Sequence, residues 1–149
     1  MLLMALPALA AAAQPELCPW LNAATAGGVL GGAVANVAVK RAKTGDDASC
    51  VFVRASPSLA ELRIDVETMP DPAKDFASYQ ARCRSAAVPL RAIGNQAAAC
   101  DDAGAALVVG RVRDRAFVVR ISAGGPSAPS GALRDKARNI AEQVAGILF

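Results

Sequence analysis

Residues 107–119 read LVVGRVRDRAFVV, and this stretch decides the fold. Two apolar triplets, 107–109 and 117–119, flank a charged centre at 113–115, a pattern that predicts two strands joined by a turn. Because successive strand residues point to opposite faces, consecutive apolar residues are typical of strands that are covered on both sides. The stretch therefore predicts an antiparallel hairpin inside a sheet that has helices on both faces.

The preceding sequence predicts three further strands. Residues 61–67 alternate apolar and charged side chains, which is typical of a strand with one solvated face. Residues 34–40 and 50–53 lie on either side of a polar turn, so they predict a second hairpin. Residues 88–94 look irregular, a short extended stretch that ends in a turn.

Three helices are expected. Asn22 is suited to cap a short helix that glycines end at 31–32, and Asp71 with Pro72 is suited to start a second. Ser130 is suited to cap a helix that runs to residue 148. Its apolar stripe recurs at helical spacing and consists of Leu133, Ala137, Ile140, Ala141, Val144 and Leu148. The sequence predicts a single-domain α+β sandwich: an antiparallel sheet of about five strands, helices on both faces and a long C-terminal helix.

The N-terminus is expected to be the remnant of a secretory signal. Residues 1–13 are apolar and end in three alanines, which fits cleavage before Gln14. No Lys or Arg precedes the apolar run, so either the true start lies upstream or the signal is unusually bare. A membrane anchor is the rival interpretation, but thirteen residues are too few for a membrane-spanning helix. We expect residues 14–149 to form one disulfide-stabilised domain that is periplasmic or secreted, with no stable membrane anchor after cleavage.

The four cysteines, Cys18, Cys50, Cys83 and Cys100, fit an exported chain. Three pairings are open, and the local one, Cys18 with Cys50 and Cys83 with Cys100, is favoured because each bond closes a short loop. On the chain-entropy argument each would stabilise the fold by about 3–4 kcal/mol. Four buried free thiols are the alternative.

The composition excludes several functions. The chain has no histidine, so histidine-dependent hydrolysis and histidine-ligated zinc are ruled out. A net charge of +3 is too small to predict nucleic-acid binding. We expect no catalytic site, no metal site and no cofactor.

Arginines supply the one candidate binding site. Arg111, Arg113 and Arg115 share the parity of one strand face and Arg120 lies nearby, so they could bind an anionic ligand, a polyanionic envelope polymer or an acidic partner. Solvated surface residues at a hairpin tip are the alternative.

An enzyme would have to use carboxylates, Tyr79, or Lys and Arg. Glu61, Asp65 and Glu67 share one strand face and could offer paired carboxylates for acid–base work or for calcium. Arg63 lies among them, however, and the alternation by itself predicts a solvated face. The discriminating observation is a cleft that holds two or more carboxylates with shifted pKa values, from the set Asp65, Glu67, Asp101 and Asp102. The glycines at 27–28 and 31–32 lack the lysine and hydroxyl of a phosphate-binding loop and are interpreted as helix punctuation. Trp20 is expected to pack against the disulfide of its neighbour Cys18.

Several short motifs carry a resemblance. Cys18, Leu21 and Asn22 precede an alanine-rich helix that ends in glycine, Cys50 begins a strand, and residues 93–97 read IGNQA, close to an "IGDxA" turn. In these features the chain resembles small exported bacterial domains of unknown function, several of them actinobacterial cell-envelope lipoproteins. The resemblance covers most of residues 14–149 and implies a PsbP-like sandwich. The chain departs from those domains in lacking a lipidated cysteine and in having a second cysteine pair, and the resemblance transfers no functional residue.

The function expected from the sequence is an exported, non-enzymatic binding or accessory module of the bacterial cell envelope. Its partner would be a protein, a small ligand or an envelope polymer. The alternatives are a small carboxylate-dependent periplasmic enzyme and a structural subunit of an envelope assembly.

Overall fold

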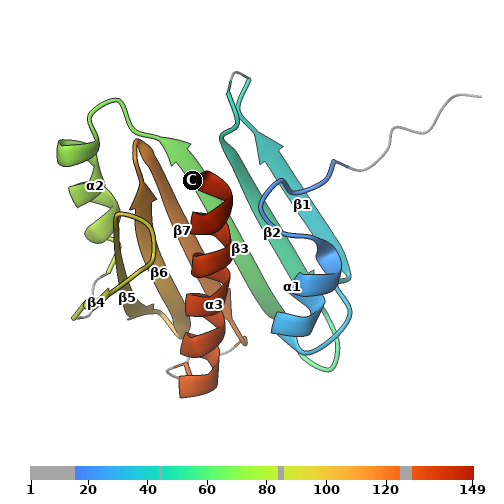
Figure 1. Ribbon diagram of the computed structural model, residues 1–149. Coiled ribbons are helices and arrows are strands. Elements are labelled where there is room, and N and C mark those ends of the chain that lie inside the picture. The colour runs from blue at the N-terminus through green and yellow to red at the C-terminus, as the bar shows by residue number, and fades with distance from the viewer. Residues whose placement is uncertain (1–15, 44, 84–85, 125–128) are drawn as a thin grey trace, which may run out of the picture.

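The computed structural model describes residues 16–43, 45–83, 86–124 and 129–149, so the expected signal remnant at 1–13 lies outside the described residues. The described residues form one antiparallel sheet of seven strands, with three helices packed on it (Figure 1). The strands follow the order β1-β2-β3-β7-β6-β5-β4 across the sheet, so that β3 and β7, distant in sequence, lie side by side at its centre.

The strands are β1 (Asn36–Arg41), β2 (Ala48–Arg54), β3 (Ala60–Thr68), β4 (Val88–Leu90), β5 (Gln96–Asp102), β6 (Ala105–Val112) and β7 (Arg115–Ser122). The helices are α1 (Ala23–Leu30), α2 (Pro72–Gln80) and α3 (Gly131–Leu148).

The prediction of about five strands was wrong, because β4 and β5 were missed. β5 reads QAAACDD, and alanine and aspartate are depleted in strands, so local propensity gave no signal. Its conformation depends on pairing: it is in register with β6 over seven residues, from Gln96 opposite Arg111 to Asp102 opposite Ala105. β4 has only three residues and pairs with β5.

The three helix starts agree with the expected caps. The side chain of Asn22 accepts a hydrogen bond from the backbone N–H of Thr25 at 2.8 Å, and that of Ser130 accepts one from Leu133 at 3.1 Å. Asp71 caps α2 with Pro72 in its first turn. Gly31 ends α1 in the left-handed conformation, at φ 74°, whereas Gly27 and Gly28 lie inside the helix.

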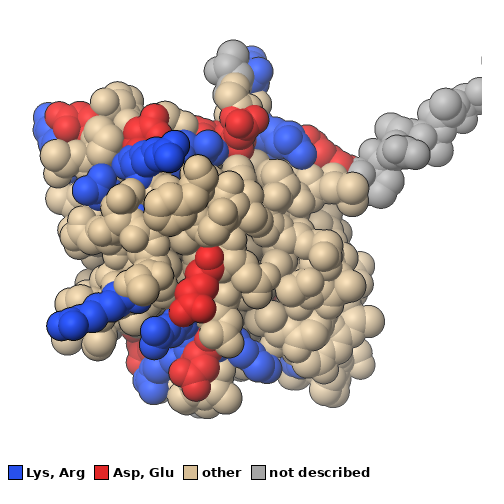
Figure 2. Space-filling view, in the orientation of Figure 1, with Lys and Arg blue, Asp and Glu red and all other residues tan. Residues whose placement is uncertain are grey.

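The sheet has two faces that differ in their cover. Val108, Val119 and Ile64 point to the face of α1 and α3 and share a buried cluster with Ile140 of α3. The alternate residues Val109 and Val118 point to the opposite face, where α2 packs against β6 and β7. Viewed from the α1 and α3 side, charged residues lie along the upper rim, over α3 and below it, whereas the surface over α1 carries none (Figure 2).

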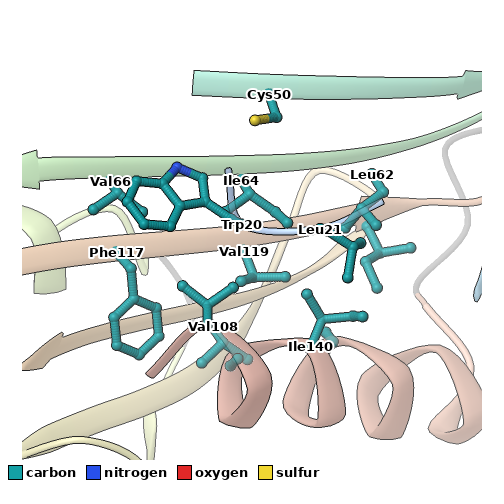
Figure 3. Close-up of a cluster of buried hydrophobic side chains, with 14 of the residues drawn as sticks. Trp20, Leu21, Cys50, Leu62, Ile64, Val66, Val108, Phe117, Val119 and Ile140 are labelled. Atoms are coloured by element: carbon teal, nitrogen blue, oxygen red, sulfur yellow. The ribbon is translucent and has the colours of Figure 1, made fainter. Parts of the chain in front are cut away.

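The main core lies between the sheet and the pair α1 and α3. Trp20 is only 5% exposed and lies among Ile64, Val66 and Phe117 (Figure 3). Its indole N–H points to the carbonyl of Ala48 at 3.4 Å. The tryptophan is therefore part of the core that also holds Cys50, and it is not exposed for docking.

A glycine shapes the centre of the sheet. Gly110 lies opposite Phe117, and a Cβ atom placed on it would come within 2.2 Å of the Phe117 ring. The absence of a side chain at this position lets the ring lie across β6.

Two disulfides join distant elements. Cys18 is bonded to Cys50 and Cys83 to Cys100, which is the pairing that the short loops favour. The first bond fastens the segment before α1 to β2, and the second fastens the end of α2 to β5. Disulfides form and persist in oxidising compartments, so the pairs indicate an extracellular or periplasmic environment. In the part of the chain that the structure describes, no helix has the length and hydropathy needed to cross a membrane.

Candidate functional site

The outward side of β1, β2 and β3, opposite α1 and α3, is the candidate site, and we call it the open face. α2 packs against β6 and β7 and leaves these three strands without a covering helix among the described elements. The β3 side chains that point there are the charged ones of the alternating pattern, with Arg63 half-exposed and Asp65 partly buried. The wet face predicted for residues 61–67 is this surface.

Two arginines stand directly opposite each other where the open face meets β7. Arg63 of β3 and Arg120 of β7 are register partners in the antiparallel pair. Like charges in directly opposed positions destabilise a sheet unless they are compensated. The arrangement therefore concentrates positive charge at one place on the face.

Carboxylates compensate both arginines in part. The Arg63 guanidinium contacts Asp65 at 3.0 Å, and that of Arg120 lies 3.7 Å from Asp102. Asp65 also accepts a hydrogen bond from the Ser49 hydroxyl at 2.5 Å. Both pairs are open to solvent on one side, so each contributes little to stability and can exchange partners with a ligand.

A third arginine borders this cluster from the end of α2. The Arg82 guanidinium lies 5.1 Å from the ring centre of Tyr79, and within the described residues no carboxylate forms an ion pair with it. The Tyr79 hydroxyl donates a hydrogen bond to Glu67 of β3 at 2.5 Å. Burial, the hydrogen bond to Glu67 and the charge of Glu67 raise the pKa of Tyr79 above its ordinary value, so the phenol stays protonated as a donor.

The three arginines of this cluster border a shallow hollow. It has a volume of about 320 Å³, and its apolar floor is formed by Leu107 and Val118. Arg63, Arg82 and Arg120 line it together with two aspartates, so the groups around the hollow carry one net positive charge. A second hollow of about 340 Å³, lined by Lys40 and Ser49 among others, shares Arg63 and Asp65 with the first. The pair of hollows spans the open face from β1 to the end of α2.

The structure separates the four arginines that sequence parity grouped. Arg111 points to the α2 side, opposite Ala116, whereas Arg115 lies opposite Val112, which is buried on the α3 side. Arg113 occupies the tight turn in the left-handed region, at φ 54°, so strand parity does not continue through it. Only Arg120 belongs to the cluster on the open face.

Arg115 has a structural role of its own. Its guanidinium lies 5.7 Å from the centre of the Trp20 ring and 3.3 Å from the Asp47 carboxylate. It closes one end of the core and is not available to a ligand in this arrangement.

Two of the four carboxylates do share a hollow: Asp65 and Asp102 line the one beside Arg120, and Asp65 and Glu67 line its neighbour. Three of the four point to the α2 side of the sheet, and each has its own partner. Asp65 contacts Arg63 and Ser49, Glu67 accepts a hydrogen bond from Tyr79, and Asp102 lies near Arg120. Asp101 points to the opposite face, where its hydrogen bond to Arg134 at 2.6 Å lowers the pKa of its carboxyl group. A lowered pKa is the opposite of what a carboxylic general acid needs near neutral pH.

Glu61 shares the open face with Arg63 by parity, yet it does not line the two hollows. Among the described residues, no group of three or more His, Cys, Asp and Glu side chains is placed to hold a metal ion.

Sequence reasoning missed Arg82 and treated Arg63 only as a residue that neutralises its neighbours. The alternation of apolar and charged residues over 61–67 did predict that Arg63 faces solvent. No sequence signal places it beside Arg120, because the β3–β7 pairing joins segments about fifty residues apart.

Neither a scan against protein-family models nor a search of the curated proteins finds a match to the chain. The resemblance to small exported envelope domains therefore stays a prediction.

Proposed function

We propose that the protein is an exported, non-enzymatic binding module of the cell envelope that holds an anionic group on its open face. The observation that carries the proposal is the convergence of Arg63, Arg82 and Arg120 on one hollow, with Arg82 lacking a carboxylate partner there. Guanidinium groups bind carboxylates and phosphates through paired hydrogen bonds, and a cluster of them selects for negative charge.

The shape of the site also supports an amphiphilic ligand. Leu107 and Val118 give the hollow an apolar floor, so a ligand with an apolar part beside its anionic group would use both features. The neighbouring hollow shares Arg63 with the first, but its three carboxylates balance its three cations, so the anionic group of a ligand is expected in the first hollow. An acidic envelope polymer or a small anionic ligand fits this surface.

Compartment and fold support the proposal as well. Two disulfides fit work outside the cytoplasm. The sheet positions Arg63 and Arg120, and the Cys83–Cys100 bond fastens the segment that carries Arg82 to β5. Removal of the signal remnant before Gln14 belongs to the same proposal, and mass spectrometry of the mature protein tests it.

The decisive experiment measures binding of two soluble probes, hexaglutamate and inorganic polyphosphate, by titration calorimetry at low and at physiological salt. Arg82→Gln should weaken binding at least about tenfold, since it removes a charge-assisted contact worth about 1.5–3 kcal/mol. This substitution leaves no carboxylate without its partner. Lys74→Gln, on the exposed side of α2, is the matched control, because it changes the net charge equally outside the hollow.

The proposal predicts that the control binds like the wild type. Equal weakening by both substitutions would mean that only net charge is sensed, and no binding of either probe by the wild type would refute the site. Chemical turnover of a probe would instead favour the carboxylate-dependent enzyme.

A further inference from the structure

A long stretch of the sequence, residues 17–39, contains no charged side chain. These residues form the segment before α1, α1 itself and most of β1, and together they account for the uncharged surface in Figure 2. A continuous surface of this kind is typical of an interaction site.

The uncharged surface includes an open sheet edge. β1 is the terminal strand of the sheet, and it pairs with β2 in unbroken register from Asn36 opposite Val53 to Arg41 opposite Ala48. In a regular antiparallel pair, every second residue directs its N–H and C=O away from the neighbouring strand. The outer side of β1 therefore offers a row of backbone donors and acceptors to another strand.

The opposite edge of the sheet is protected, which makes β1 distinctive. β4 has only three residues, and its central residue, Pro89, has no N–H to donate. β1 has six residues and contains neither proline nor a bulge. Its only charged residues, Lys40 and Arg41, lie at its C-terminal end, so its central residues 37–39 lack the usual protection against edge pairing.

A groove runs beside this edge on the α1 side. It has a volume of about 570 Å³; Val37, Val39 and Phe52 line it from the strands, and Leu17 lines it from the segment before α1. Leu17 is 77% exposed and Val37 is 37% exposed, although both are apolar. The groove would gain an apolar cover if the sheet continued beyond β1.

We propose that β1 pairs antiparallel with β1 of a second copy of this chain, about a two-fold axis at Ala38. In this register Val37 of each copy lies opposite Val39 of the other, on the side of the groove. The two sheets then form one continuous sheet, and the apolar floors of the two grooves adjoin.

The placement of charge on β1 favours this self-pairing. The only charged residues of the strand are Lys40 and Arg41, both at its C-terminal end. Antiparallel pairing about Ala38 places Lys40 opposite Asn36 of the other copy and Arg41 opposite Ala35. Like charges are therefore never directly opposed, whereas a parallel pair in register would place each cation against its copy.

The strand pair alone does not give enough area for a stable dimer. Six residues span about 20 Å, and stable interfaces bury about 800 Å² on each partner. Leu17 and the start of α1 line the groove on the same face, and the proposal requires them to supply the remaining apolar surface. This surface is also the apolar patch that a structural subunit of an envelope assembly requires.

Cysteine crosslinking tests the register directly. Ala38→Cys should form an intermolecular disulfide on a non-reducing gel, because directly opposed residues have Cα atoms about 4.5–5.5 Å apart. Lys40→Cys is the matched control on the same exposed face, and its two copies would be about 14 Å apart, too far to bond. Crosslinking of Lys40→Cys without Ala38→Cys would refute the register.

A charge substitution tests the dimer itself by sedimentation or light scattering. The wild type should have twice the monomer mass, and Ala38→Lys should be monomeric because two ammonium groups would oppose each other at the axis. Val88→Lys, on the protected edge, adds the same charge at a position that is 61% exposed and should remain dimeric. A wild type that is monomeric at all concentrations, or an Ala38→Lys variant that stays dimeric, would overturn the proposal. Both readouts are independent of anionic ligands, so they leave the proposed function of the open face untouched.

Discussion

The two halves of the sheet differ in how they are covered. β6 and β7 lie between α3 on one face and α2 on the other, and nearly all of their residues are buried. β2 and β3 have α1 on one face only, and their burial alternates from residue to residue. The sequence shows this contrast as apolar runs in β6 and β7 and as alternation in β3. It misleads for β2, because the consecutive apolar residues Val51, Phe52 and Val53 predict cover on both faces, whereas Val51 and Val53 are only partly buried.

The difference in cover assigns stability and binding to different parts of the sheet. Strands that are buried on both faces supply the apolar contacts that hold the fold together, but they expose few side chains to a ligand. The edge of β1 belongs to the half with one cover, and the anion hollow lies where the two halves meet: Arg63 comes from β3, whereas Leu107 and Arg120 come from β6 and β7.

The two disulfides anchor different halves, and removing each in turn should give unequal losses. On the chain-entropy argument, sequence separations of 32 and 17 residues predict losses of about 4 and about 3 kcal/mol for Cys18–Cys50 and Cys83–Cys100. Cys50 is also fully buried in the main core, so its replacement adds a packing cost. Paired Cys→Ala variants, compared by guanidinium unfolding, should therefore rank Cys18 and Cys50 as the more damaging pair.

Hydrogen exchange on the same variants locates the damage. Loss of Cys83–Cys100 should expose amides of α2 while β2 and β3 stay protected, because that bond fastens α2 to β5. A uniform loss of protection across the sheet would contradict the division into two differently covered halves.

Two valines on the same side of the sheet test the effect of cover alone. Val118 points under α2 and is 4% exposed, whereas Val51 occupies the equivalent outward side of β2 and is only partly buried. Val118→Ala should reduce the free energy of unfolding by about 2 kcal/mol and Val51→Ala by less than about 1 kcal/mol, in proportion to the apolar area that each buries. Equal losses in urea unfolding would show that the open face is covered in solution by something else.

Periodicity and caps predicted much of this fold. The three helix starts followed from Asn22, Asp71 and Ser130, whose side chains accept hydrogen bonds from the first turns of their helices. The apolar runs of β6 and β7 predicted cover on both faces for a local reason: each residue of such a run must be buried on its own side. β5 could not be predicted in this way, because its alanines are strand residues only by virtue of the strands beside them.

The candidate site was less predictable than the fold. Parity grouped Arg111 with Arg115, but the left-handed turn at Arg113 places their side chains on opposite faces. The cluster on the open face depends on the pairing of β3 with β7, which fixes Arg63 opposite Arg120. Pairing between distant strands is set by the whole topology, so neither residue's local sequence contains it.

Tyr79 lies at the boundary between the two halves, since it belongs to α2 but donates its hydrogen bond to Glu67 of β3. Burial is the main cause that raises the pKa of Tyr79, followed by the hydrogen bond to Glu67 and the charge of Glu67. Because it is the only tyrosine of the chain, the ultraviolet absorbance of its phenolate reports on this contact alone. In the native protein the phenol should resist ionisation at pH values where it ionises in urea, near its ordinary pKa of about 10.

The sign of the stability effect follows from these two pKa values. Below about pH 10 the phenol is protonated in both states, and the contact contributes fully to stability. As the pH rises further, the unfolded chain loses its proton first, so stability falls with pH. Glu67→Gln should lower the pKa of Tyr79, because it removes the adjacent negative charge, whereas Glu61→Gln on the same strand face should leave the titration unchanged. If native Tyr79 titrates as it does in urea, α2 is not held against β3, and the border between the covered and the open half is not where the structure places it.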